Sequence, residues 1–163
     1  MMKFVYEKTL LASYNAIEEI INRMDKLFLK TATGSYTCTL PCGEIAERLI
    51  DMTQRKLALI CVRATVDEAL GKLSEGSKKM IRYKYFGEPD KEIDKIRNTR
   101  TYFRRQLAAL LRFSRALASI GYTEEKFKEE CLGFAFMSAV YDEYEEKCGL
   151  KKKLPSSCYR IKA

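Results

Sequence analysis

Residues 73–113 read LSEGSKKMIRYKYFGEPDKEIDKIRNTRTYFRRQLAALLRF, and the order of apolar, capping and helix-breaking residues in this stretch predicts three consecutive helices. Ser74 stands where a helix cap belongs, so we expect the first helix to cover 75–85. The turn that contains Pro89 ends this helix, because proline has no amide hydrogen and restricts the residue before it.

The other two helices begin at polar caps. Asp90 can cap a short helix over 91–96, and either Asn98 or Thr99 can cap a longer one. Gly121 supplies a left-handed stop for the longer helix. The first helix, a turn, the short helix, a tight turn and the longer basic helix together predict a helix-turn-helix unit over residues 72–121.

The longer helix is predicted to have an apolar face and a basic face. We expect the buried side to be centred on Phe103 and to include Phe103, Leu107, Leu110 and Ser114. Steps of about 100° per residue then place another set on the opposite side. That set is Thr101, Arg105, Ala108 and Arg112, with Arg104 and Arg115 beside it.

The positive charge of the chain is concentrated around this unit. The net charge is +8, and residues 72–115 contain 13 basic and 5 acidic residues, which is also +8. The segments before and after are balanced, with 9 against 9 and 8 against 8. A polyanion is therefore the expected partner.

Arginine at the start of the longer helix favours double-stranded DNA, because a guanidinium can bind phosphate oxygens or the O6 and N7 atoms of guanine. The first turns of a recognition helix enter the major groove, and basic residues before it can bind the backbone. The predicted DNA-binding residues are Lys95, Arg97, Arg100, Thr101, Arg104, Arg105 and Arg112.

Residues 73–115 resemble region 4 of bacterial sigma factors, and more closely the sigma-like regulators of phages and prophages of Gram-positive bacteria. The resemblance implies transcription regulation and RNA polymerase as a possible partner. The matching residues are Arg82, Tyr83, Tyr85 and Phe86 in the first helix, Ile93 in the short helix, and Asn98, Thr101 and Arg104 in the longer helix.

The N-terminal part, residues 1–71, is predicted to form a long antiparallel hairpin. Apolar residues from Leu10 to Phe28 are spaced by three and four, and the helix is expected to end near Lys30. A second helix of about thirty residues is expected to start near Pro41, with Thr39 as its cap.

The C-terminal part is predicted to contain one packing helix over 123–147, within a segment 122–150, followed by a basic tail over 151–163. Its large apolar residues are too many for one stripe, so at least two sides must be covered. The hairpin, the helix-turn-helix unit or a second subunit of a homodimer would cover them. The fold class is therefore all-α.

Composition disfavours enzymes. The chain has no histidine, and Cys38 with Cys42 lacks the second pair that a zinc site needs. No nucleophile and base can be nominated, so we expect no catalytic residue, no metal and no cofactor. Aromatic residues around the turn are interpreted as core: Tyr83, Tyr85, Phe86, Tyr102 and Phe103.

The sequence also gives expectations about the cellular location of the protein and about alternative functions. No run of about eighteen apolar residues is present, and the charged pair Glu7 and Lys8 disfavours a signal peptide, so we expect a cytoplasmic protein without a membrane partner. The main alternative function is a non-catalytic helical protein-interaction module. A phage DNA-packaging adaptor, which binds DNA as a ring, stays open.

Overall fold

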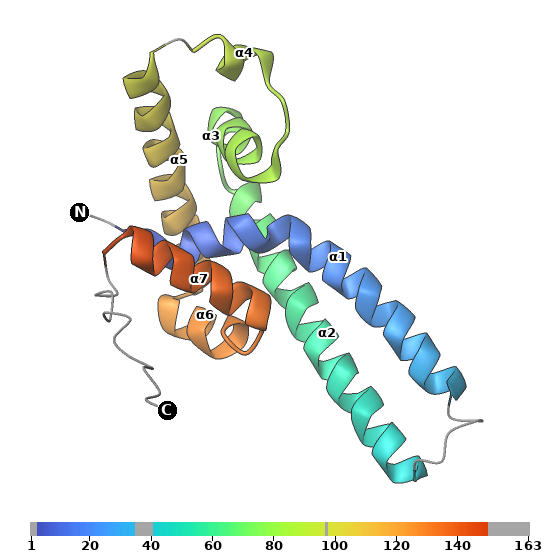
Figure 1. Ribbon diagram of the computed structural model, residues 1–163. Helices are drawn as coiled ribbons and strands as arrows, with labels where there is room; N and C mark the ends of the chain where they lie inside the picture. Colours follow the sequence, from blue (N-terminus) through green and yellow to red (C-terminus); the bar gives the residue numbers. More distant parts are fainter. Residues whose placement is uncertain (1–2, 35–40, 97, 150–163) are drawn as a thin grey trace, which may run out of the picture.

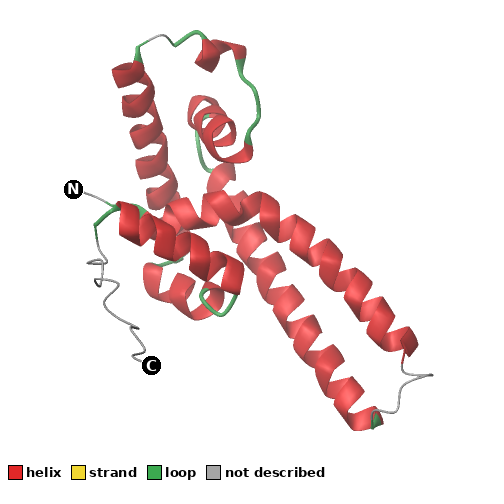
Figure 2. Cartoon of the chain, in the orientation of Figure 1, coloured by secondary structure: helices red, strands yellow, loops and turns green. Residues whose placement is uncertain are grey.

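Every regular element that the structure describes is a helix, which confirms the all-α class (Figure 2). The computed structural model describes residues 3–34, 41–96 and 98–149. In chain order the helices are α1 (Val5–Gly34), α2 (Cys42–Gly71), α3 (Glu75–Ile81), the π-helix η1 (Arg82–Phe86), α4 (Lys91–Asp94), α5 (Thr99–Ile120), α6 (Glu124–Cys131) and α7 (Ala135–Lys147).

Helices α1 and α2 lie side by side in opposite directions, and their distal halves project from the rest of the molecule as an arm (Figure 1). Cross-helix ion pairs fix the register: Glu18 pairs with Arg63 at 3.3 Å, and Asp25 pairs with Lys56. Helix α1 is longer than expected and continues past Lys30 to Gly34. The proposed Thr39 cap lies outside the described residues.

The main core lies where the proximal half of α1 meets α2, α5, α6 and α7. Leu10, Leu59, Phe113, Phe127 and Met137 are all fully buried there. These side chains come from five different helices, so the core holds the inner end of the arm together with the C-terminal half of α5.

Helix α3 continues into η1, and Gly87 ends this segment in the left-handed conformation, with φ at 70°. The short helix predicted over 91–96 is only one turn, Lys91–Asp94. Asp90 caps α4 by accepting hydrogen bonds from the backbone N–H groups of Glu92 and Ile93, at 2.8 and 3.2 Å.

The prediction of a single C-terminal helix over 123–147 is wrong, because the structure has two helices there. The helical conformation is interrupted between Cys131 and Ala135. This segment contains Gly133, and glycine has a low helix propensity. Helix α7 then folds back along α1 (Figure 1). The rings of Phe127 of α6 and Tyr141 of α7 are in contact, with their centroids 5.5 Å apart, so the chain itself covers these apolar faces.

Candidate nucleic-acid interface

Helix α5 carries only positive charge along its 22 residues. It has five arginines and neither aspartate nor glutamate. Of the two predicted caps, Asn98 is the one that caps it, because its side chain accepts hydrogen bonds from the N–H groups of Arg100 and Thr101, at 2.9 and 3.3 Å. Among the described residues, no carboxylate forms a salt bridge with any of these arginines. Their charge is therefore available to a ligand.

The predicted buried face of α5 is wrong by about 80° of rotation, since steps of 100° place Phe113 that far from Phe103. Phe103 and Leu107 are 58% and 56% exposed, whereas Leu110 and Phe113 are buried. The C-terminal half of α5 packs on the core, and this contact sets the rotation of the whole helix. In the N-terminal half the Tyr102 ring packs on Tyr83 of η1, whereas Phe103 and Leu107 are left largely uncovered.

The corrected rotation still leaves the arginines away from the core. Arg100 and Arg104 are exposed on the outer side of the first turns. Arg112 turns toward α3 and donates a hydrogen bond from Nη1 to the Ser77 hydroxyl at 2.8 Å. Arg105 lies on the same side as Arg112, over α3 and α4. The basic residues thus cover an arc of α5 from its free side to its contact with α3.

A groove between α3 and α5, here called the α3–α5 groove, is lined by this arc. Its first part lies beside α4 and its second part beside the end of α2, and Arg112 belongs to both. In the second part Lys72 donates a hydrogen bond to the Ser119 hydroxyl at 3.1 Å. The cationic lining residues are Lys72, Lys79, Arg105, Arg112 and Arg115.

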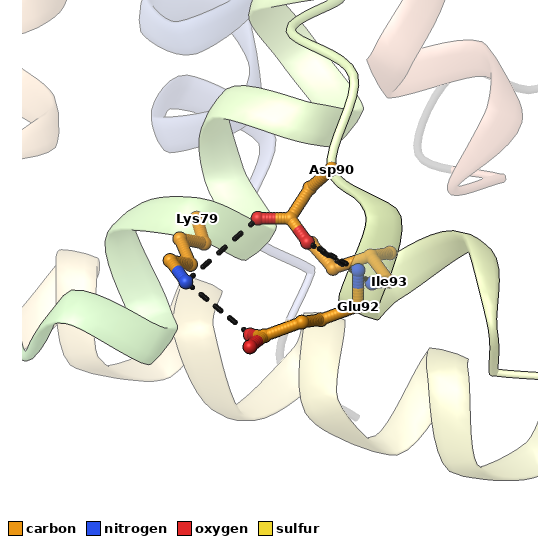
Figure 3. Close-up of polar contacts among 4 residues, drawn as sticks. All are labelled: Lys79, Asp90, Glu92 and Ile93. Carbon is orange, nitrogen blue, oxygen red and sulfur yellow. Dashed lines mark hydrogen bonds and ion pairs between the residues drawn. The ribbon is translucent and has the colours of Figure 1, made fainter.

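Among the described residues, Glu92 supplies the one carboxylate that lines the groove, and this carboxylate is bound to a groove lysine. Lys79 Nζ donates to Glu92 Oε2 at 3.2 Å and lies 4.0 Å from Asp90 Oδ2 (Figure 3). The hydrogen bond to Glu92 raises the pKa of Lys79. This contact ties α3 to the cap of α4 and so fixes the turn that leads into α5.

Aromatic contacts hold the start of α5 on η1. The Tyr83 hydroxyl donates to Asp94 at 2.7 Å, a bond that raises the pKa of Tyr83. The rings of Tyr83 and Tyr102 meet edge to face, with centroids 6.3 Å apart. Burial raises the pKa of Tyr85. These tyrosines pack against the core as expected, as does Phe86, whereas Phe103 does not.

The other predicted DNA-binding residues have separate positions. Lys95 is exposed at the end of α4, and Thr101 is half-buried in the first turn of α5. Arg97 lies outside the described residues. Lys72 and Lys79 were not among the predicted residues, because they are distant from α5 along the chain and reach it only through the packing of α3 on α5.

Other chemistry is sparse in the part of the chain that the structure describes. No group of three or more His, Cys, Asp or Glu residues there is arranged to hold a metal ion. Cys42 and Cys61 are exposed on α2, and burial raises the pKa of the Cys131 thiol to about 11. Cys38 lies outside the described residues.

Within residues 3–34, 41–96 and 98–149 no helix combines the length and the apolar character that crossing a membrane requires. Comparison with protein-family models, with curated proteins and with solved structures returned no significant match.

Proposed function

We propose that this protein binds double-stranded DNA through α5 and the α3–α5 groove. The observation that carries the proposal is the set of five arginines on α5 with no carboxylate partner among the described residues. Guanidinium groups that have no carboxylate partner, spaced along one helix, match the repeated negative charge of a phosphate backbone.

The positions of the arginines divide the proposed contacts into two groups. Arg100 and Arg104, on the free side of the first turns, are suited to the major groove. Arg105 and Arg112, in the α3–α5 groove with the lysines of α3 and α2, are suited to backbone phosphates. The caps at Asp90 and Asn98 support this reading because they orient the entry to α5.

A role in transcription regulation is a further step of the same proposal. It rests on the resemblance of residues 73–115 to sigma region 4, which also makes RNA polymerase a candidate partner. The α4 segment that would act as a positioning helix is a single turn. Contacts between α3 and α5 would then do most of the positioning of the recognition helix.

The test is a fluorescence-anisotropy titration of a random duplex with the full chain at several salt concentrations. Log affinity should fall linearly with log salt, by about 0.9 for each phosphate contact. Replacement of Arg104 and Arg105 together by alanine should weaken binding and flatten the slope by about one for each phosphate contact that is lost. The melting temperature should not change, because both side chains are exposed.

A matched control removes two arginines elsewhere. Arg23 and Arg55 are exposed on the arm, where they pair with Glu19 and Asp51 one helical turn away. Their double alanine variant changes the net charge by the same amount and should keep the affinity of the parent. Equal weakening by both pairs, or no duplex binding at about 50 mM salt, would contradict the proposed interface.

One observation favours a second candidate, a protein-interaction module. Phe103 and Leu107 are more than half exposed beside Arg100 and Arg104. An acidic protein surface with an apolar centre would cover all four side chains. This candidate predicts weak duplex binding with a shallow salt slope, so the same titration distinguishes it from DNA binding.

A further inference from the structure

Helix α2 has a second apolar stripe on the side that faces solvent. Its members are spaced by four and three residues in alternation, the spacing of a coiled-coil seam. All of them are exposed, and Ile50, Leu57 and Ile60 have exposed fractions of 57%, 54% and 40%. The outer stripe of α2 consists of Ala46, Ile50, Thr53, Leu57, Ile60 and Ala64.

No other helix of the described chain covers this stripe. Ile45, Leu59, Val62 and Val66 face the interior on the other side of α2. A third side contacts the α6–α7 turn through the region of Arg55. Steps of about 100° per residue place the outer stripe roughly opposite both neighbours, so it points away from the molecule.

The four charged residues of α2 between Ile50 and Ala64 are turned the other way. Lys56 and Arg63 pair with acidic residues of α1. Asp51 and Arg55 pair with each other at 3.1 Å beside the α6–α7 turn. The hydroxyl of Thr53 donates to the carbonyl oxygen of Leu49 at 2.8 Å, which leaves its methyl group for the stripe. An exposed helix normally carries charged and polar residues on its solvent face, whereas the solvent face of α2 carries the apolar outer stripe.

The size of the stripe fits a second copy of the chain. At about 200 Å² for a fully exposed side chain, the three large residues leave on the order of 300 Å² of apolar surface exposed, and the small residues between them add to it. Two such stripes in contact over five helical turns would bury on the order of 1,000 Å², which is what a specific interface needs.

We propose that the outer stripe of α2 pairs with the same stripe of a second copy to form a homodimer. An antiparallel pair with its two-fold axis near the level of Arg55 places isoleucine against isoleucine and alanine against alanine. Ile50 then faces Ile60 of the second copy, Thr53 faces Leu57, and Ala46 faces Ala64. This arrangement joins the two arms into four helices and keeps the two α3–α5 grooves at opposite ends. It does not depend on DNA binding.

Sedimentation equilibrium of the full chain tests the proposal. The parent should sediment at twice 18.9 kDa. Leu57→Glu places an unpaired charge in the interface and should raise the dimer Kd by at least about 100-fold. Circular dichroism and melting of the dissociated variant check that the chain stays folded, which its exposed position predicts.

Leu107→Glu is the matched control, because Leu107 on α5 is exposed to nearly the same extent as Leu57. This variant should remain a dimer. A parent that is monomeric at about 100 μM, a dimer that survives Leu57→Glu, or a dimer that Leu107→Glu dissociates would each overturn the proposal.

A crosslink tests the antiparallel register. In that register Glu47 lies next to Cys61 of the second copy, on one edge of the stripe. Glu47→Cys under mild oxidation should therefore give a disulfide between two copies that involves Cys61, identified by mass spectrometry of the peptides. The further change Cys61→Ser should remove this bond. An intact dimer of Glu47→Cys without a 47–61 crosslink would overturn the antiparallel register.

Discussion

Helices α2 and α5 are held in the same way but expose opposite chemistry. Each has one end in the shared core and a second part with a free face. The free face of α5 carries arginines beside two apolar side chains, whereas the free face of α2 has no charge along its outer stripe. The two surfaces are separate, and we propose an anionic partner for the one on α5 and an apolar partner for the one on α2.

The largest expected effect separates the two ends of α5. Phe113 is fully buried in the core, so Phe113→Ala should lower the free energy of unfolding by about 3 to 5 kcal/mol. Phe103→Ala should lower it by less than about 1 kcal/mol, because the ring is 58% exposed. Urea denaturation followed by circular dichroism measures both. Equal losses would mean that the N-terminal half of α5 is covered in solution.

The next effect separates the two faces of α2. Leu59 is fully buried against the core, and Leu59→Ala should cost about 2 to 5 kcal/mol. Leu57, two residues earlier, is exposed, so Leu57→Ala should change the stability of the monomer by about 0.5 kcal/mol or less.

The same pair of variants tests the dimer. If the outer stripe associates, the melting temperature of the parent rises with protein concentration. Leu57→Ala should reduce this dependence, and Leu59→Ala should retain it at a lower temperature. A dependence unchanged by Leu57→Ala would mean that α2 has no partner at this face.

Local signals in the sequence predicted much of the fold. Asp90, Asn98 and Gly121 act on the backbone within a few residues, so their roles as caps and stop could be inferred without any tertiary contact. The apolar spacing of α1 likewise placed Ile17 in the core. The break at Gly133 was missed because the apolar residues on both sides continue without a polar interruption.

The candidate site was harder to predict because it depends on packing between helices. The rotation of α5 was assigned from Phe103 and Leu107, the large residues of its first half, but Phe113 and the second half determine it. The basic composition of residues 72–115 was visible in the sequence. Only the approach of α3 to α5 shows that Lys72 and Lys79 share a groove with the α5 arginines.

A smaller effect is expected at the caps that lead into the two helices of the groove. Asn98 accepts two backbone hydrogen bonds at the start of α5, so Asn98→Ala should cost about 1 kcal/mol and weaken duplex binding. Ser74 precedes α3 without a side-chain bond to the backbone, so Ser74→Ala should cost only a few tenths of a kcal/mol. Thermal melts of both variants compare them. A larger loss for Ser74→Ala would contradict the assignment of the caps.

The smallest effect concerns the root of α5, where α1 contributes a buried carboxyl. Glu7 is 4% exposed, and its Oε1 accepts a hydrogen bond from the Ser114 hydroxyl at 2.7 Å. Burial raises the pKa of Glu7 above its ordinary value of 4.5. Burial also raises the pKa of Tyr6 to about 12, so Tyr6 stays protonated under mildly acidic and neutral conditions.

The raised pKa of Glu7 fixes the sign of a pH dependence. Between 4.5 and its raised value, the folded chain binds more protons than the unfolded chain, so this group makes stability fall as the pH rises. Glu7→Gln keeps an acceptor for Ser114 but cannot ionise, and should flatten this part of the profile. Urea unfolding from about pH 4 to about pH 8 measures it. Glu129→Gln, an exposed change on α6, should leave the profile as it is in the parent. If Glu7→Gln leaves the slope unchanged, another group produces it, and the contact between α1 and α5 does not bury a carboxyl in solution.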